Sequence, residues 1–443
     1  MMKFQRYMKQ TLINLLAGTL KLLAKATVWR YRPAIVGVTG NVGKTSTKLA
    51  IAAVLADERR VRWSKSNLNN ELGLPLTILG DWSEEELRLV SRAQAAGEKK
   101  TQKILFWLKV VLFSFAKLIY VRRSSYPEVL VLEYGADHPG DIKRLISIAR
   151  PNVAVLTAVG DVPVHVEFYD DPEAVAREKA HLIECLPTSG YAVLVYDDAR
   201  VMSLRDRTRG HIMTFGFNKG ADLQVSNFEN RVKDDHPAGI GYKLNYGGNV
   251  VPMTIDGVLG RAHAYAGAAA AAAGVVFGMN LVKISEALRK YHPAPSRMEI
   301  LPGVKDTWIL NDSYNASLLA MEKALEALEN LPGKRKVAVL GDMLEIGKYS
   351  MEAHEKVGGI AAKCADILVT VGPHARFIAE GARKSGLNKR NIYSYDTAEE
   401  AARPVQDLLK KGDLVLIKGS RAIGLEKVVE EIRYVDTSMV EVD

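Results

Sequence analysis

The sequence predicts an α/β protein built from two units, and three observations lead to this class. A short apolar run at 35–38 precedes a glycine-punctuated turn and a helical segment from Lys44 to Leu55. Further apolar runs at 128–132, 152–157 and 192–195 alternate with helical stretches, which is typical of a parallel sheet. After the prolines at 293 and 295 a second alternation begins. We therefore expect a central sheet domain and a C-terminal Rossmann-like αβ domain.

Composition limits the function classes before any motif is considered. The chain has 443 residues, of which 48% are hydrophobic, so we expect two or three domains with large cores. Its two cysteines favour a reducing compartment and exclude a disulfide framework. The net charge of +9 is unevenly distributed, because no acidic residue occurs before Asp57 or between Glu98 and Glu128. A groove that binds nucleic acid needs basic residues interleaved with aromatics, whereas this surplus lies in two apolar stretches. We therefore expect no nucleic-acid partner.

Those two stretches predict helices outside the sheets. Residues 1–32 show leucines at helical spacing opposite a polar stripe and predict a basic amphipathic helix; a signal peptide is the alternative. Residues 81–126 predict an apolar helical insertion. Its segment 104–121 is consistent with an interfacial helix, with packing against residues 1–32, or with a membrane span, although Lys109 and Lys117 disfavour a span.

The glycine-punctuated turn predicts a phosphate-binding loop. Glycines let backbone N–H groups approach phosphate oxygens, and the following helix N-terminus adds its dipole. Lys44 is placed to reach the β- and γ-phosphates of ATP, and Thr45 to hold Mg²⁺. The spacing is a variant of the usual one, since Val38 stands where the first glycine belongs, and an ordinary strand-to-helix turn is the alternative. The residues expected to contact ATP here are Gly40, Asn41, Val42, Gly43, Lys44, Thr45 and Ser46.

Other elements follow in chain order. The strand at 128–132 ends at Glu133, which is well placed beside a P-loop strand to bind Mg²⁺. Residues 211–256 predict a β-rich flap, and 257–279 an alanine-rich helix. We expect an N-terminal helix over 1–32, a central ATP-binding domain over 33–295 that carries the 81–126 insertion, and a C-terminal domain over 296–443. Polar motifs follow three of the C-terminal strands, where open αβ sheets bind ligands.

Several ordered motifs together resemble the Mur ligases, from about residue 33 to 429. They are Thr-Gly-x-x-Gly-Lys-Thr at 39–45, Asn-x-Asn-Asn-Glu-Leu-Gly-Leu-Pro-Leu-Thr at 67–77, Leu-Glu-Tyr-Gly-Ala-Asp at 132–137, Asp-Ser-Tyr-Asn-Ala at 312–316, Val-Leu-Gly-Asp-Met-Leu-Glu-Ile-Gly at 339–347 and Lys-Gly-Ser-Arg at 418–421. The chain looks most like the branch that adds D-Ala-D-Ala to a muramoyl-peptide in peptidoglycan synthesis. The resemblance implies an ADP-forming ligase that uses ATP and Mg²⁺ and passes through an acyl phosphate.

The resemblance also implies roles for individual residues. Thr45 and Glu133 would hold the first Mg²⁺; His165 matches a second-metal ligand, and Lys179 matches a lysine that family members carbamylate. Lys44, His165 and Lys179 are thus the catalytic candidates. From the C-terminal domain, Arg297, Asp312 and Asn315 match nucleotide contacts. The residues implied to face the two substrates are Asn67, Asn69, Asn70, Thr77, Lys418, Ser420 and Arg421.

Two departures from the family pattern set the remaining expectations. The segment 261–266 lacks the asparagines found in the family, the last of which contacts adenine, so either adenine recognition differs or the register shifts by one residue. About thirty residues precede the P-loop strand, where family members carry a UDP-binding domain, so that domain is expected to be lacking. We expect a cytoplasmic monomer, with peripheral contact to an anionic membrane at its inner face. The alternatives are a related ligase with another acceptor, lipid-linked acceptors included, and a non-catalytic membrane-attached ATP-binding protein.

Overall fold

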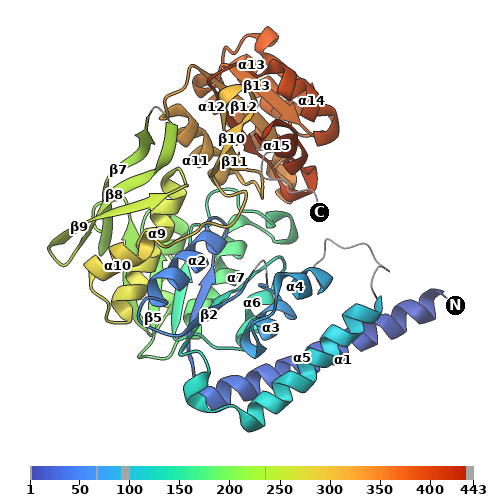
Figure 1. Ribbon diagram of the computed structural model, residues 1–443, viewed down its shortest axis with the longest axis vertical. Helices are drawn as coiled ribbons and strands as arrows, with labels where there is room; N and C mark the ends of the chain where they lie inside the picture. The colour runs from blue at the N-terminus through green and yellow to red at the C-terminus, as the bar shows by residue number, and fades with distance from the viewer. Residues whose placement is uncertain (1, 66–67, 91–99, 235, 436–443) are drawn as a thin grey trace.

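The computed structural model describes residues 2–65, 68–90, 100–234 and 236–435. Its strands form one sheet of nine strands and one of six, and the chain passes from the first to the second between residues 288 and 299. Figure 1 shows the six-stranded sheet with its helices above the nine-stranded sheet. The predicted α/β class is confirmed.

The first sheet has the strand order β2-β3-β1-β4-β5-β6-β7-β8-β9. The strands from β2 to β7 pair in parallel, and β8 and β9 complete an antiparallel edge. The β-rich segment predicted at 211–256 is present, and it continues this sheet. The strand bounds are β1 (Ala34–Thr39), β2 (Val61–Trp63), β3 (Val129–Glu133), β4 (Val153–Leu156), β5 (Tyr191–Val195), β6 (His211–Gly216), β7 (Leu223–Lys233), β8 (His236–Tyr246) and β9 (Asn249–Asp256).

Small residues bring the helices of this sheet close together. The alanine-rich helix α9 (Arg261–Val276) packs along α2 (Lys44–Leu55), and the alanines from 268 to 273 are completely buried. A Cβ at Gly274 would lie 3.0 Å from Val54, so the glycine permits this approach. The remaining helices of this part are α6 (Asp141–Ile146), α7 (Pro172–Glu184), α8 (Ala199–Met202) and α10 (Leu281–Leu288).

A pair of long helices lies beside the sheet, as predicted for the two basic apolar stretches. Helix α1 (Met2–Tyr31) contacts α5 (Lys100–Tyr120), and both contact α3 (Gly73–Leu79), while α4 (Glu84–Val90) contacts α5. The Tyr31 ring stacks on Tyr126 at 4.4 Å, and the Tyr31 hydroxyl donates to the carbonyl of Lys117 at 2.6 Å. In the described parts of the chain, no helix combines the length and apolarity that a membrane span requires.

The second sheet has the order β10-β11-β15-β12-β13-β14. All its pairs are parallel except β10 with β11, an antiparallel edge that the sequence patterns did not indicate. The strands are β10 (Glu299–Gly303), β11 (Thr307–Asp312), β12 (Arg335–Gly341), β13 (Ile367–Val371), β14 (Ile392–Tyr395) and β15 (Asp413–Lys418). The helices are α11 (Leu318–Glu329), α12 (Ser350–Cys364), α13 (Arg376–Lys384), α14 (Ala398–Leu408) and α15 (Glu426–Ile432).

Candidate active site

The loop between β1 and α2 has the backbone of a phosphate-binding loop. Gly40 has a φ of 143°, and a Cβ there would lie 2.0 Å from the Thr157 hydroxyl. Gly43, with a φ of 85°, immediately precedes the first residue of α2. Side chains rarely adopt either conformation, so glycine is required at both positions. The ammonium of Lys44 folds back and donates to the carbonyl oxygens of Gly40 and Asn41 at 3.0 and 3.3 Å.

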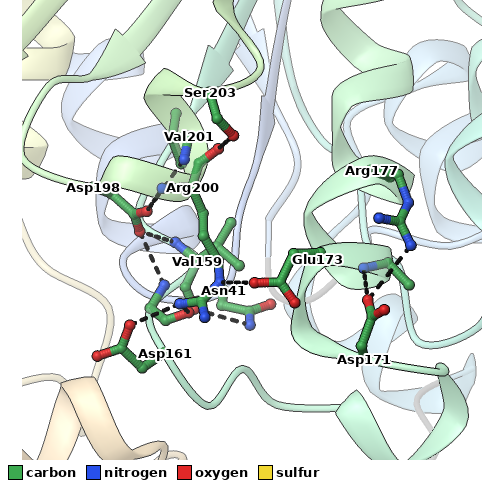
Figure 2. Close-up of polar contacts among 12 residues, drawn as sticks. Asn41, Val159, Asp161, Asp171, Glu173, Arg177, Asp198, Arg200, Val201 and Ser203 are labelled. Carbon is green, nitrogen blue, oxygen red and sulfur yellow. Dashed lines mark hydrogen bonds and ion pairs between the residues drawn. The ribbon is translucent and has the colours of Figure 1, made fainter.

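A second loop, residues 158–161 after β4, braces the P-loop. The backbone N–H groups of Asn41 and Val42 donate to the carbonyl of Ala158 at 2.9 and 3.1 Å. Asp198 accepts from the N–H groups of Val159 and Gly160 at 2.7 and 2.9 Å. Figure 2 shows Asp198 and the Asn41 amide bound to Val159 of this loop, together with Arg200, which binds both Asp161 and Glu173. The P-loop is therefore held by a polar network that extends to α8.

Glu133, at the carboxyl end of β3, is the centre of a buried polar cluster. It accepts from the Thr45 hydroxyl at 3.1 Å and from the Asn69 amide at 3.2 Å. The Lys48 ammonium lies 3.2 Å from its Oε2, and both side chains are almost completely buried. Lys48 was not predicted as a site residue. The available signal was its position one helical turn after Lys44, on the face of α2 that meets the sheet.

The charges around Glu133 control its ionisation. Burial acts to raise the pKa of Glu133, but Lys48, Lys44 and Arg297 together outweigh burial and lower it. Burial lowers the pKa of Lys44 and of Lys48, and Glu133 partly opposes this in both. The carboxylate is therefore ionised at neutral pH, and it compensates cations that the fold has removed from water.

Arg297 reaches this cluster from the segment that precedes the second sheet. Its guanidinium donates to the Thr45 hydroxyl at 3.2 Å and lies 4.1 Å from the centroid of the Tyr314 ring. Its Nε is buried and has no hydrogen-bond partner among the described residues. His263 Nε2 lies 2.9 Å from the Arg297 carbonyl, so this histidine of α9 positions the arginine. The segment 261–266, which departs from the family pattern, therefore contributes a support for Arg297.

His165 lies between two carboxylates. Its Nε2 is 3.4 Å from Asp137, and its Nδ1 is 2.7 Å from Glu345, a contact without hydrogen-bond alignment. Both His165 and Glu345 have a positive φ, 69° and 62°. Burial is the main cause that lowers the pKa of His165 to about 4, against the opposing effect of Asp137. Neither Asp137 nor Glu345 was named as a site residue, although both lie within the family motifs.

Lys179 is buried on α7 close to these groups. Burial lowers its pKa to about 7, and Lys44 adds to this effect while Asp137 opposes it. The neighbouring Glu178 has a structural role, since its carboxylate accepts from the N–H groups of Gly140 and Ile142 at the start of α6. A large neutral fraction at physiological pH makes Lys179 a nucleophilic amine.

The C-terminal candidates pair with one another. The Lys418 ammonium, which is buried, lies 2.5 Å from Asp312 and donates to the Asn315 carbonyl at 3.0 Å. Asp312 also accepts from the Met298 N–H at 3.1 Å, so it fixes the backbone next to Arg297. The Asn315 side chain is exposed.

Two further C-terminal candidates lie in the loop after β15. The buried Ser420 hydroxyl accepts from the N–H of Leu344 at 2.9 Å. Arg421 is exposed and stacks over Tyr314 at 5.0 Å, on the ring that Arg297 also contacts. Of the two, Arg421 is the one open to solvent.

The polar segment before α3 divides into two groups. Asn69 contacts Glu133 and belongs to the cluster. The Asn70 side chain accepts from the N–H groups of Leu72 and Gly73, and the buried Thr77 hydroxyl donates to the Gly73 carbonyl, so both stabilise α3. Asn67 lies outside the described residues.

The residues present fit a nucleotide and a magnesium ion. The P-loop backbone and the unpartnered Nε of Arg297 suit phosphate oxygens. The Thr45 hydroxyl and Glu133 carboxylate offer the hard oxygen ligands that Mg²⁺ prefers. Within the described ranges, histidine, cysteine and acidic residues form no group of three that could hold a metal without other ligands. Mg²⁺ in nucleotide sites uses one or two carboxylates plus phosphate oxygens, so two protein ligands are compatible with it.

Both parts of the chain are similar to known proteins. The Mur ligase middle domain matches residues 113–274, and the Mur ligase glutamate ligase domain matches 296–421, together more than half of the chain. The UDP-N-acetylmuramoyl-tripeptide–D-alanyl-D-alanine ligase of Bacillus subtilis is 29% identical over 93% of this chain and 79% of its own length. The Synechocystis enzyme of the same name is 28% identical over 92% and 76%. The crystal structure of MurF ligase from Thermotoga maritima with ADP has a TM-score of 0.74 at 27% identity, covering 94% of this chain and 83% of that one. With both domains matched and the P-loop cluster in place, the chain belongs to the Mur ligases.

Proposed function

We propose that this chain is an ATP-dependent, ADP-forming ligase that joins D-Ala-D-Ala to a UDP-N-acetylmuramoyl-tripeptide. The observation that carries the proposal is the contact of Arg297 with the Thr45 hydroxyl beside Glu133. It brings an arginine from the C-terminal segment to the P-loop, so one nucleotide can bridge both parts. The relatives that bear this activity in their names support the choice of substrates.

The reaction begins with transfer of the γ-phosphoryl group to the tripeptide carboxylate. The carboxylate oxygen attacks phosphorus and ADP leaves, which gives an acyl phosphate. The physical difficulty is repulsion between two anions and the charge that develops during transfer. Lys44 and Arg297 stabilise this charge, and the P-loop N–H groups hold the phosphates. Gly40, Gly43 and Ser46 complete this cradle, and Asn41 and Val42 shape it through their hydrogen bonds to the Ala158 carbonyl. We assign Asp312 and Asn315 to the nucleotide side of the C-terminal domain.

In the second step the dipeptide amine attacks the acyl carbon, phosphate leaves and the amine loses a proton. We assign Arg421, with Lys418 and Ser420 of the same loop, to the dipeptide carboxylate, because an exposed guanidinium suits that charge. Asn69, with Asn67 of the same segment, is assigned to the muramoyl-peptide side, whereas Asn70 and Thr77 stabilise the helix α3 that follows them.

Thr45 and Glu133 would hold Mg²⁺, which neutralises phosphate charge when bound. His165 and a carbamylated Lys179 would hold a second ion. The neutral amine of Lys179 can add to the carbon of carbon dioxide and release a proton, and the resulting carbamate is an anionic oxygen ligand in place of the ammonium. Asp137, 3.4 Å from His165, adds a carboxylate to this position.

We assign residues 33–295 to the ATP-binding domain, residues 296–443 to the C-terminal domain and residues 1–32 to a separate helix. We place the enzyme in the cytoplasm as a monomer, where ATP and soluble precursors are available.

The test is phosphate release from ATP and Mg²⁺ with UDP-MurNAc-tripeptide, with and without D-Ala-D-Ala. Dipeptide-dependent release that is lost in Lys44→Ala supports the proposal. If a folded, ATP-binding protein releases no phosphate with these substrates, the assignment of substrates is wrong and another acceptor must be sought.

A further inference from the structure

The helix pair α1 and α5 exposes an apolar surface that no catalytic role explains. On α5, five large apolar side chains recur at helical spacing along one face, and each is more than half exposed. On α1, three more recur every seven residues on one face, and each is at least two-thirds exposed. We name these eight residues the apolar platform: Ile104, Leu108, Leu112, Phe115 and Ile119 of α5, and Leu15, Leu22 and Trp29 of α1.

The opposite faces of both helices are buried. Leu20, Ala24 and Tyr31 of α1 and Phe106 and Val110 of α5 belong to the core of the first sheet. Both helices contact α3 on this side. The apolar platform therefore points away from the body of the protein, and Figure 1 shows the helix pair at the end remote from the second sheet. An exposed apolar surface of this extent marks a binding site.

The charge around the platform selects its partner. The stretch 13–32 carries four lysines or arginines, the stretch 101–123 carries five, and neither contains an acidic residue. Glu86 of α4 lies 2.5 Å from Lys109 and pairs with one of these cations. The exposed cations on these stretches are Lys25, Arg30, Arg32, Lys109, Arg122 and Arg123.

A second copy of this surface would bring like charges together, whereas an anionic lipid surface complements them. Apolar residues with Trp and Phe beside Lys and Arg are the composition of helices that lie in a bilayer interface. We propose that the apolar platform inserts into the interface of an anionic lipid bilayer and attaches the ligase to it peripherally. This attachment concerns where the enzyme is located, and it does not depend on the proposed ligase activity.

The connections of the two helices fix how the bound enzyme is oriented. Helix α1 leads through residues 32–33 into β1, and α5 leads through 121–128 into β3, and these strands pair in parallel. Both connections therefore enter the amino ends of the strands, whereas the P-loop and Glu133 lie at the carboxyl ends. The stacked rings of Tyr31 and Tyr126 lock the two connections together. The P-loop and Glu133 then face away from the lipid, toward soluble nucleotide and peptide.

The experiment is co-sedimentation of the whole protein with phosphatidylglycerol vesicles and with phosphatidylcholine vesicles. We expect binding to phosphatidylglycerol that weakens with salt, and little binding to phosphatidylcholine. The variant Leu112→Gln/Phe115→Gln should raise the apparent dissociation constant by about tenfold or more, because two inserted side chains lose their apolar transfer energy. The matched control, Val250→Gln/Val282→Gln, alters equally exposed apolar residues elsewhere and should bind like the original protein.

Three results would overturn the proposal. The first is that the protein binds neither phosphatidylglycerol nor phosphatidylcholine vesicles. The second is that the platform variant and the original protein bind equally well. The third is a dimer in analytical ultracentrifugation that dissociates in the platform variant. The last would assign the surface to a second copy. Thermal unfolding of each variant checks the fold, and Ile104→Gln/Leu108→Gln replaces the first variant if that one unfolds. Phosphate release in solution should be unchanged in all of them, which separates this test from that of the ligase activity.

Discussion

Replacing Lys48 by methionine tests whether the buried pair with Glu133 is required for the fold. The two charged atoms are 3.2 Å apart, and both side chains are at most 3% exposed, so water screens the pair very little. Removing one partner of a buried pair leaves the other charge uncompensated, which costs about 3–5 kcal/mol. We therefore expect Lys48→Met to lower the free energy of unfolding in urea by about that amount. Lys219→Met, at an exposed position, is the matched control and should change little.

A double variant separates the charge from the shape of the site. In Lys48→Met/Glu133→Gln the buried charge is removed on both sides, and the glutamine carbonyl can still accept from Thr45. Replacing both members of a buried pair is often close to neutral. We expect the double variant to recover most of the lost stability while remaining without ligase activity. The reasoning is refuted if Lys48→Met unfolds like Lys219→Met, or if the double variant is less stable than Lys48→Met alone.

The Lys48–Glu133 pair also predicts how the loss of stability in Lys48→Met varies with pH. In the intact protein the folded-state pKa of Glu133 is lowered below its usual 4.5, so its stabilisation is present above that value and lost as the pH falls. Without Lys48 the largest charge that opposes burial is gone, so the pKa of Glu133 is higher than in the intact protein and the folded state takes up a proton more readily. The difference in stability between Lys48→Met and the original protein should therefore shrink as the pH is lowered. A difference that grows toward acidic pH contradicts this.

Three further predictions concern catalysis. Gly40→Ala places a Cβ on the Thr157 hydroxyl at a φ of 143°, so ATP affinity measured by calorimetry should fall by about a hundredfold or more, and unchanged affinity would contradict the loop geometry. Arg297→Lys keeps the charge but loses the planar donor set, and we expect kcat to fall by about tenfold to a hundredfold; an unchanged kcat would remove Arg297 from the transition state. Because the pKa of Lys179 is about 7, its reactive neutral form increases from pH 6 to 8, so added bicarbonate should raise activity most near pH 6 to 7, and Lys179→Ala should abolish that response.

The elements of both sheets were predictable because their signals are local. The apolar runs ending at Thr39 and Glu133 and the glycines at 40 and 43 determine a strand, a turn and a helix within a few residues. The pairing of β10 with β11 was not predictable, since the reversal between the partly buried β10 and the mostly buried β11 places Lys305 and Asp306, rather than glycines, at positive φ. The first sheet continues through the parallel pairing of β5 with β6, after which β7, β8 and β9 follow as antiparallel hairpins with short turns.

Candidate site residues could be predicted where they belong to a sequence motif. They could not be predicted where a residue outside the motifs contacts the site only in the folded structure. Thr45, Glu133 and Arg297 come together from three distant segments, as the resemblance implied. Lys48 was missed because a lysine on a helix is ordinarily a surface residue, and only the packing of α2 against β3 buries it. The sequence could not show that Asn69 contacts Glu133 while Asn70 stabilises the start of α3. The directions of these two adjacent side chains depend on the backbone conformation of the loop before α3.

The Thr45 hydroxyl couples the two parts of the site through its hydrogen-bonding capacity. A hydroxyl has one donor and two acceptor positions. It donates to Glu133 and accepts from Arg297, which leaves one lone pair for Mg²⁺. The arginine and the metal can therefore act on Thr45 together. His263 contacts the Arg297 carbonyl, and the Tyr314 ring packs against the Arg297 guanidinium. The position of Arg297 therefore depends on how the C-terminal segment lies against the P-loop. Phosphate charge developing at the P-loop would attract the same guanidinium that this hydroxyl already holds, so this contact couples the C-terminal segment to the phosphate site.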